Sequence, residues 1–315
     1  MAYVVSFGGT IMNFLALLGA LALNYYRPHT RLDWLHHAFA PYARMLERNC
    51  NDGKNLHGIF AWILGAFLPA LIVGVIYFFL LQINVLLAIL FGVIVLYLTL
   101  RFGQFGQHAE KTLAALREGN IEVARDLFAR WESTGDNEYK PAELARLSIE
   151  TILRRTHHGL FGPIFWFVVL GPAGALFYRL THLLKLEWHP EQDSAFNQFT
   201  RRAFEWLDWL PTRVTAGAFA VVGDFEDAVY CWRTQALSWP DKGLGIILAS
   251  GAGALGVKLG EPIFERGILL FRPEIGLGDE ADADYLQSAI GLVWRVLVLM
   301  LGLLFLLTFA HWIGK

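Results

Sequence analysis

The sequence predicts an all-α integral membrane protein, and three observations lead to this fold class. Hydrophobic residues make up 55% of the 315-residue chain and charged residues only 17%. Separate apolar windows, about five or six of them, are long enough to cross a bilayer as helices. The polar stretch 104–158 carries apolar residues at the three- and four-residue spacing typical of amphipathic helices. The net charge of −2 gives no reason to expect nucleic acid as a partner.

The apolar windows predict the transmembrane helices in order. The first, 5–25, lacks a basic start and a small-residue cleavage site, so we interpret it as a retained span and not a signal peptide. The window 243–259 is short and rich in glycine, which favours a short re-entrant or buried helix over a full span. The remaining windows are 58–81 and 84–100, which form a helical hairpin, then 160–178, a weaker one at 206–223, and 290–313.

Basic residues predict the topology. The amphipathic loop 26–57 and the segment 101–158 flank the predicted hairpin, and both are rich in arginine and lysine. Positive charge favours the cytoplasmic side, so we expect a multi-pass plasma-membrane protein with its amino terminus outside. Within 101–158, Gly119 marks a helix–helix turn and Pro141 the start of a further helix. We expect one integral membrane domain, 1–315, that contains 101–158 as a cytoplasmic helical insertion.

Motifs that bind metals or phosphate are not evident in the sequence. It lacks a phosphate loop, a dinucleotide fingerprint and zinc-ligand spacing. The adjacent histidines 157 and 158 point about 100° apart on a helix, so they do not readily chelate one ion, and no metal site is predicted. Cys50 and Cys231 lie far apart, and we expect two free thiols.

Ionisable residues beside the spans are the first candidates for a site, because charge in a lipid environment is expensive. Arg179 follows the span 160–178, and Glu205 precedes Asp208 and Arg213 in the weaker one. Pro211 stands between Asp208 and Arg213 and predicts a broken helix, which would expose a polar site at membrane depth. The alternative is a structural ion pair at a helix end.

The span 160–178 is also interrupted, by prolines 163 and 172 and by neighbouring glycines. This pattern indicates either a kinked helix with close packing or the wall of a cavity for a large ligand. Glu150 and Arg154 stand four residues apart on the preceding helix, a spacing typical of a surface ion pair.

Four stretches of the chain together are similar to a known family. They are ALREGNIEVARDLF at 115–128, IETILRRTHHGLFGPIFWFVVLGPAGALFYR at 149–179, FEWLDWLPTRVTAGAFAVVG at 204–223, and ASGAGALGVKLGEP at 249–262 followed by RPEIG at 272–276. In this order they resemble the CobD/CbiB membrane proteins of cobalamin biosynthesis, the adenosylcobinamide-phosphate synthases. They also resemble the related AmpE membrane proteins, which share the LDW-P-x-R pattern at 207–213.

The resemblance implies a bacterial inner-membrane enzyme of the ligase type. Its reaction joins a carboxylate of a corrinoid to aminopropanol phosphate, with ATP and Mg²⁺. Under the alternative hypothesis, the chain is a non-catalytic AmpE-like membrane protein for signalling or ligand binding. The implied partners are the lipid bilayer, a corrinoid or another large ligand, and a second copy of the chain. No cofactor is firmly implied, and Mg²⁺ and ATP belong only to the synthase hypothesis.

Departures from the family pattern fall on residues that the chemistry would use. Glu150 matches the family glutamate, but Arg154, Arg155 and His158 stand where the synthases have an acidic and amide group. These replacements remove ligands that a hard cation prefers. The paired aspartates before the proline are replaced by Phe204 and Glu205.

The resemblance also assigns roles to seven residues, which we expect to line one pocket open to the cytoplasm. Arginine forks suit phosphate oxygens, and carboxylates suit an amine or a metal. The catalytic candidates are Glu150, Glu205 and Asp208, and the substrate-binding candidates are Arg179, Arg213, His158 and Tyr178.

Overall fold

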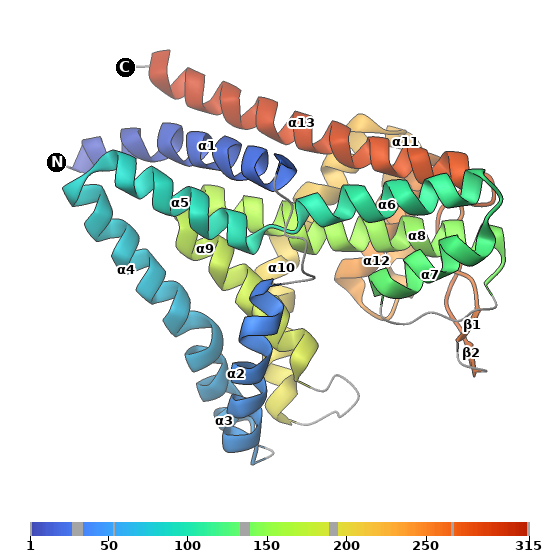
Figure 1. Ribbon diagram of the computed structural model, residues 1–315, viewed down its shortest axis with the longest axis horizontal. Helices are drawn as coiled ribbons and strands as arrows, with labels where there is room; N and C mark the ends of the chain where they lie inside the picture. Colours follow the sequence, from blue (N-terminus) through green and yellow to red (C-terminus); the bar gives the residue numbers. More distant parts are fainter. Residues whose placement is uncertain are drawn as a thin grey trace. The chain divides into compact units, whose positions relative to one another are not determined.

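The computed structural model describes residues 2–26, 34–52, 54–132, 139–188, 195–265 and 268–313. This part of the chain is mainly helical, with a short two-stranded hairpin between irregular segments at 256–262 and 271–282 (Figure 1). It divides into two compact units. Unit 1 contains Met1–Gly103, His158–Pro211 and Leu303–Lys315, and unit 2 contains Gln104–His157 and Thr212–Gly302.

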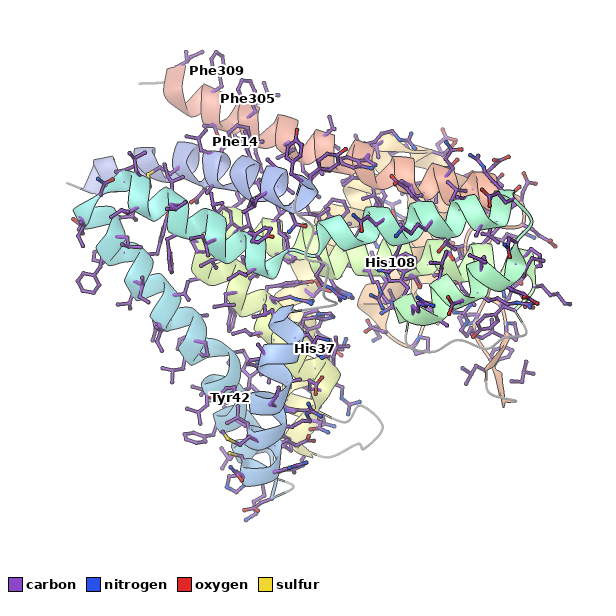
Figure 2. All side chains as sticks on the ribbon, in the orientation of Figure 1. Phe14, His37, Tyr42, His108, Phe305 and Phe309 are labelled. Atoms are coloured by element: carbon purple, nitrogen blue, oxygen red, sulfur yellow. The ribbon has the colours of Figure 1, made fainter. Side chains whose placement is uncertain are left out.

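Unit 1 is built from long apolar helices. Helix α1 packs against α5, and α9 packs against both α4 and α5 (Figure 1). Phe14 of α1 contacts Phe305 of the α13 segment in this unit, with ring centroids 6.0 Å apart (Figure 2). The helices of this unit are α1 (Ala2–Tyr26), α2 (Trp34–Cys50), α3 (Asn55–Trp62), a π-helical turn (Ile63–Phe67), α4 (Leu68–Ile83), α5 (Val85–Thr99), α9 (Gly162–Glu187) and the first part of α10 (Ala195–Val222).

The predicted helical hairpin of unit 1 is confirmed. Helix α4 ends at Ile83, and the side chain of Asn84 accepts a hydrogen bond from the backbone N–H of Leu86, 2.8 Å away, at the start of α5. An asparagine at this position satisfies a donor that the first helical turn leaves open. The boundary therefore falls where the polar turn interrupts the apolar windows.

Unit 2 carries the amphipathic helices of the insertion and the two-stranded β-hairpin. Its elements are α6 (Phe102–Arg117), α7 (Ile121–Glu132), α8 (Pro141–Thr156), α11 (Phe225–Gln235), a 3₁₀ turn (Ala236–Ser238), α12 (Lys242–Leu255), β1 (Ile263–Glu265), β2 (Ile268–Leu270) and most of α13 (Ala283–Ile313). The α6–α7 turn at Gly119 and the start of α8 at Pro141 agree with the sequence. Helix α12 is buried along most of its length and packs closely on α11.

Among the described residues, three helical stretches are long and apolar enough to cross a membrane: Asn55–Ile83, Pro141–Glu187 and Ala283–Ala310. Shorter apolar helices cover Met12–Tyr26, Val85–Thr99 and Lys242–Leu255. The helical fold with candidate membrane spans is therefore confirmed. The larger number of five or six spans, the re-entrant character of α12 and the single-domain organisation stay predictions.

Of the two helix breaks predicted beside prolines, the structure contradicts one and confirms the other. Helix α10 runs without interruption from Ala195 to Val222, with Pro211 inside it, so the predicted break between Asp208 and Arg213 is wrong. The interruption predicted for the span 160–178 is present in α9, where Gly171 before Pro172 adopts φ 66° and ψ −156°. A proline disfavours helical conformation in the residue before it, and glycine leaves that conformation at little steric cost. Pro211 follows a leucine, and there the helix accommodates the proline.

The all-α prediction also missed the β1–β2 hairpin. Its strands pair antiparallel, with Ile263 opposite Leu270 and Glu265 opposite Ile268. Three residues a strand are too few for an alternating pattern to stand out in the sequence.

Candidate functional site

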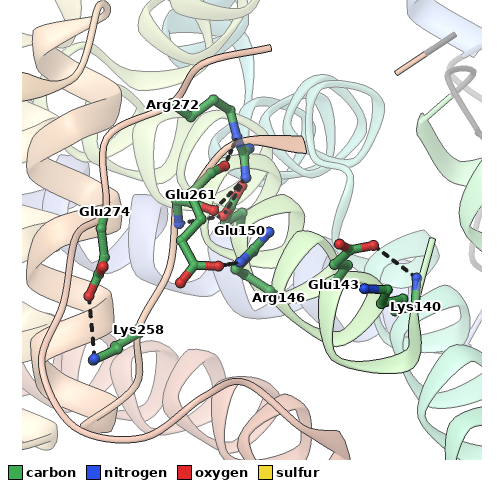
Figure 3. Close-up of polar contacts among 9 residues, drawn as sticks. Lys140, Glu143, Arg146, Glu150, Lys258, Glu261, Arg272 and Glu274 are labelled. Carbon is green, nitrogen blue, oxygen red and sulfur yellow. Dashed lines mark hydrogen bonds and ion pairs between the residues drawn. The ribbon is translucent and has the colours of Figure 1, made fainter. Parts of the chain in front are cut away.

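The candidate site in unit 2 starts from Glu150 on α8. The helix begins at Pro141, and the Glu143 carboxylate accepts a hydrogen bond from the Lys140 backbone N–H, 2.9 Å away, which fixes the first turn (Figure 3). Two turns further on, Glu150 is buried, with 7% of its surface exposed. A buried carboxylate needs hydrogen-bonding or charged partners.

Arg272 supplies most of those partners. Its guanidinium contacts Glu150 with both ends, Nη1 to Oε2 at 2.6 Å and Nη2 to Oε1 at 3.1 Å (Figure 3). The backbone N–H of Gly260 donates a third hydrogen bond to Oε1 at 2.9 Å. Arg272 also donates to the carbonyl oxygens of Gly260 and Glu261, at 2.9 and 3.2 Å. The Arg272 side chain therefore connects the loop at 260–261 to α8 through its hydrogen bonds.

The backbone conformation of the loop at 260–261 restricts which residues fit there. Gly260 has φ +83°, and a Cβ there would lie 2.0 Å from the carbonyl oxygen of Pro273, so a larger residue does not fit. Glu261 also has a positive φ, 63°, which is costly for a residue with a side chain. Its carboxylate forms an ion pair with Arg146 of α8, and this contact offsets part of the cost (Figure 3).

A second ion cluster lies at the end of α7. Glu132 accepts hydrogen bonds from Arg154 through Oε2 and from Arg155 Nε through Oε1, the latter at 2.7 Å. The Arg155 guanidinium also lies over the Trp131 ring, 5.7 Å from its centroid. Burial alone would raise the pKa of Glu132, but the two arginines outweigh it and hold that pKa below its ordinary value.

A cavity of about 150 Å³ joins the two ion clusters of unit 2. Its apolar lining comes mainly from α12 and the segments around it, and its charged lining comes from both clusters. Because carboxylates and guanidiniums share one small space, the cavity suits a polar ligand with groups of both charges. The lining residues are Phe128, Glu132, Tyr139, Leu147, Glu150, Thr151, Arg154, Trp239, Leu244, Leu248, Ile263 and Arg272.

A separate polar cluster lies inside unit 1. The Tyr178 hydroxyl donates to Asp208 Oδ1 at 2.7 Å, and His158 Nε2 lies 3.5 Å from Asp208 Oδ2. Tyr178 fits only because residue 162 is glycine, since a Cβ there would lie 2.4 Å from the tyrosine oxygen. His158 belongs to the π-helical turn His157–Phe161, which precedes α9.

Arg179 extends this cluster through a histidine. Its Nη1 lies 3.2 Å from Nδ1 of His182, whose ring stacks on His158 with centroids 4.6 Å apart. A guanidinium can only donate, so His182 accepts at Nδ1 and carries its proton on Nε2. Both Arg179 and His182 are buried.

The seven predicted residues are divided between the two units. Glu150 lines the cavity of unit 2. His158, Tyr178, Asp208 and Arg179 gather in unit 1. Glu205 is exposed on α10, and Arg213 lies partly exposed further along that helix. Their functional roles stay predictions.

Sequence reasoning missed Glu132 and Arg272. Arg272 begins the RPEIG stretch that carries part of the family resemblance, so a signal was present. For Glu132 the sequence offered none, because its partners Arg154 and Arg155 lie more than twenty positions along the chain. Glu150 and Arg154 do not form the expected surface ion pair, because Glu150 contacts Arg272 and Arg154 contacts Glu132.

The carboxylates of unit 2 do not fit Mg²⁺ as they stand. In the described part of the unit, N–H donors contact both oxygens of Glu150 and both of Glu132. A magnesium ion needs oxygen ligands in octahedral geometry, and these oxygens face arginines. No catalytic step through a protein-bound magnesium ion follows from this lining.

These features define a class of protein: mainly helical, with apolar helices long enough to cross a membrane, and with a small charged cavity among its amphipathic helices. The chain belongs to the CobD/CbiB family, because the family model described as CobD/Cbib protein matches residues 17–293. The resemblance inferred from the four motif stretches is therefore confirmed.

The most informative relatives are cobalamin biosynthesis proteins named CobD. The one from Stutzerimonas stutzeri is 33% identical over 301 residues, which cover 92% of this chain and 97% of the relative. The one from Chromobacterium violaceum is 36% identical over 212 residues, 67% of this chain and 68% of the relative. The one from Mycobacterium tuberculosis is 27% identical over 182 residues, which cover 56% of this chain and 58% of the relative. No solved structure matches the chain.

Proposed function

We propose that the chain is an amide-forming synthase of cobalamin biosynthesis, which joins a corrinoid carboxylate to aminopropanol phosphate. The observation that carries this proposal is the extent of the family match, residues 17–293, together with 33% identity to a CobD protein over 92% of the chain. ATP hydrolysis would supply the energy for amide formation when the nucleotide is bound.

The proposed reaction suggests roles for the buried polar residues. An amine attacks an activated carboxylate only in its neutral form, so a carboxylate near the amine must hold it and take its proton. Glu150 is the proposed group, since it is buried and lines the cavity. In unit 1, Asp208, Tyr178, His158 and Arg179 are the proposed contacts for the corrinoid side.

Two further predicted residues belong to helix α10. Glu205 and Arg213 project from α10 at exposed and partly exposed positions. They are proposed as contacts with the outer part of a large substrate, where side chains reach a ligand without being buried.

The membrane arrangement belongs to the proposal as well. We place the chain in the bacterial inner membrane as a multi-pass protein, with its amino terminus outside and 101–158 in the cytoplasm. A reporter fused to the amino terminus tests this orientation, because the opposite orientation would place the reporter in the cytoplasm.

An assay of the purified protein in detergent tests the activity. The protein is incubated with the corrinoid acid, aminopropanol phosphate, ATP and Mg²⁺, and the products are measured by mass spectrometry. We expect an amide product from the wild-type protein and a loss of at least about tenfold in rate for Glu150→Gln, or about 1.4 kcal/mol. The variant Arg130→Gln, which changes an exposed ion pair on α7, should keep the wild-type rate.

The second candidate function is a non-catalytic AmpE-like membrane protein. One observation favours it: both oxygens of Glu150 and of Glu132 are already held by N–H donors, as in a structural network. The same assay separates the two functions. A protein that binds neither the corrinoid nor aminopropanol phosphate in titration calorimetry, and forms no product, supports this second candidate.

A further inference from the structure

Helix α2 of unit 1 buries one face and leaves the other exposed. Phe39, Ala43 and Leu46 belong to the hydrophobic core of the unit, and the helix packs on α3 and α9. The exposed positions fall together on the opposite face, because an α-helix has 3.6 residues per turn. We call this surface the outer face of α2, and it consists of His37, Ala38, Pro41, Tyr42, Arg44, Met45, Arg48 and Asn49.

One side of the outer face is basic. Successive residues of a helix are about 100° apart around its axis, so Arg44, His37 and Arg48 fall within about 40° of one another. Glu47, the single carboxylate in the sequence of α2, belongs to the buried face. Arg44 lies 3.8 Å from Glu187 of α9, but its side chain remains 55% exposed. The outer face therefore presents an excess of positive charge.

The other side of the outer face is apolar. Tyr42 and Met45 are 36% and 47% exposed, and Pro41 and Ala38 adjoin them on the helix surface. His37 of the basic side and Tyr42 of the apolar side are labelled on α2 in Figure 2. Cations beside apolar groups are typical of a helix that lies in a membrane interface, where the apolar groups insert and the cations meet anionic lipids.

The position of α2 in the chain brings its outer face close to a bilayer. The helix ends at Cys50, and the candidate span Asn55–Ile83 begins five residues later. An extended chain covers at most about 3.6 Å per residue, so this connection reaches no more than about 18 Å. It contains one exposed carboxylate, Asp52, and one exposed cation, Lys54, so it adds no net charge of its own. The headgroups of a bilayer crossed by that span are therefore within reach of α2.

We infer that the outer face of α2 binds the headgroups of anionic phospholipids at the membrane surface. Arg44 and Arg48 contact lipid phosphates, and Tyr42 and Met45 insert between the lipids. Charge complementarity identifies this occupant, because an anionic lipid surface attracts clustered basic side chains. The inference goes beyond the proposed function and applies equally to a synthase and to a non-catalytic membrane protein.

Fluorescence quenching by labelled lipids tests this surface on the full chain in lipid nanodiscs. A fluorophore is attached to Asn49→Cys on the outer face, in a Cys50→Ser background that removes the neighbouring thiol, while Cys231 is buried. Nanodiscs of phosphatidylcholine contain the same small fraction of nitroxide-labelled phosphatidylglycerol or nitroxide-labelled phosphatidylcholine. We expect the anionic label to quench at least about threefold more strongly at low salt, and this preference to fall at high salt, which screens exposed charges.

Substitutions of Arg48 form a matched pair. A basic side chain near an anionic lipid surface contributes about fivefold in affinity. Arg48→Gln should therefore lower the preference for the anionic label at least about twofold, whereas Arg48→Lys should keep it. The double variant Arg44→Gln/Arg48→Gln should remove the preference. Arg130→Gln, which removes an exposed arginine of α7, should leave it unchanged, and unchanged melting temperatures show that the variants remain folded.

Equal quenching by the two labelled lipids in the wild-type background would overturn the inference and would favour an acidic protein as the partner of the basic side. A preference that survives in Arg44→Gln/Arg48→Gln would overturn it as well, because lipid binding would then not depend on these charges. The same holds for a preference that falls as much in Arg48→Lys or Arg130→Gln as in Arg48→Gln.

Discussion

The contact between Arg272 and Glu150 gives the sharpest stability prediction. Arg272→Met removes two of the three N–H donors that hold the buried Glu150 carboxylate, together with the donors to two loop carbonyls. The two side chains are 18% and 9% exposed. Removing one partner of a buried ion pair lowers the free energy of unfolding by about 3–5 kcal/mol. Because Arg272 is partly exposed, we expect a loss at the lower end of this range, about 3 kcal/mol.

A double-mutant cycle separates the pair from the general cost of a smaller side chain. Glu150→Met in the wild-type background also leaves a charge without its partner. When both residues become methionine, no unpaired charge remains, so the double variant should lose less than the sum of the single variants. We expect a coupling energy of at least about 2 kcal/mol. Equilibrium unfolding in mixed micelles, followed by circular dichroism, measures it.

The control is an ion pair of the same unit on its surface. Arg117 contacts Asp284 at 2.8 Å, but the two side chains are 46% and 83% exposed. Arg117→Met should therefore change stability by no more than about 1 kcal/mol. Additive effects of Arg272→Met and Glu150→Met, or a loss for Arg117→Met as large as that for Arg272→Met, would refute the reasoning.

Three further predictions follow from single contacts. Gly162→Ala forces a Cβ to within 2.4 Å of the Tyr178 oxygen and should cost about 1–3 kcal/mol, seen as a lower melting temperature; an unchanged melting temperature would contradict this packing. Burial raises the pKa of the Cys231 thiol to about 11, so N-ethylmaleimide at neutral pH should modify Cys50 well before Cys231 in the folded protein, as read by mass spectrometry. The pKa of Glu132 lies below its ordinary 4.5, so its stabilising contribution is present above that pH and is lost as the pH falls through the lowered pKa; Glu132→Gln should show a shallower loss of stability in acid than the wild-type protein.

Much of the helical layout follows from local sequence signals. Two apolar windows separated by a polar turn predicted α4 and α5. The boundary could be predicted because Asn84 caps α5 through a contact with a residue two positions along the chain. Pro141 begins α8 at the predicted place. Prolines inside helices were harder to interpret, because Pro211 is accommodated in α10 while the break falls at Gly171. A proline in the sequence therefore did not by itself distinguish a broken helix from a continuous one.

The site was predictable only where a residue carried the family pattern. Glu150 was identified through that pattern, and the structure places it in a cavity. Its main partner, Arg272, lies 122 positions away, and no local periodicity could indicate this contact. Glu132 is similar, since its two arginines on α8 meet it only after α7 and α8 have packed together.

Complementation of a bacterial strain that lacks the cobinamide-phosphate synthase tests the central claim most directly. We predict that the wild-type chain restores growth under conditions that require cobalamin synthesis, and that Glu150→Gln, present in the membrane at the same level, restores little or none. Failure of the wild-type chain to restore growth, despite its presence in the membrane, would contradict the synthase function. Equal growth with Glu150→Gln would contradict the role of this carboxylate.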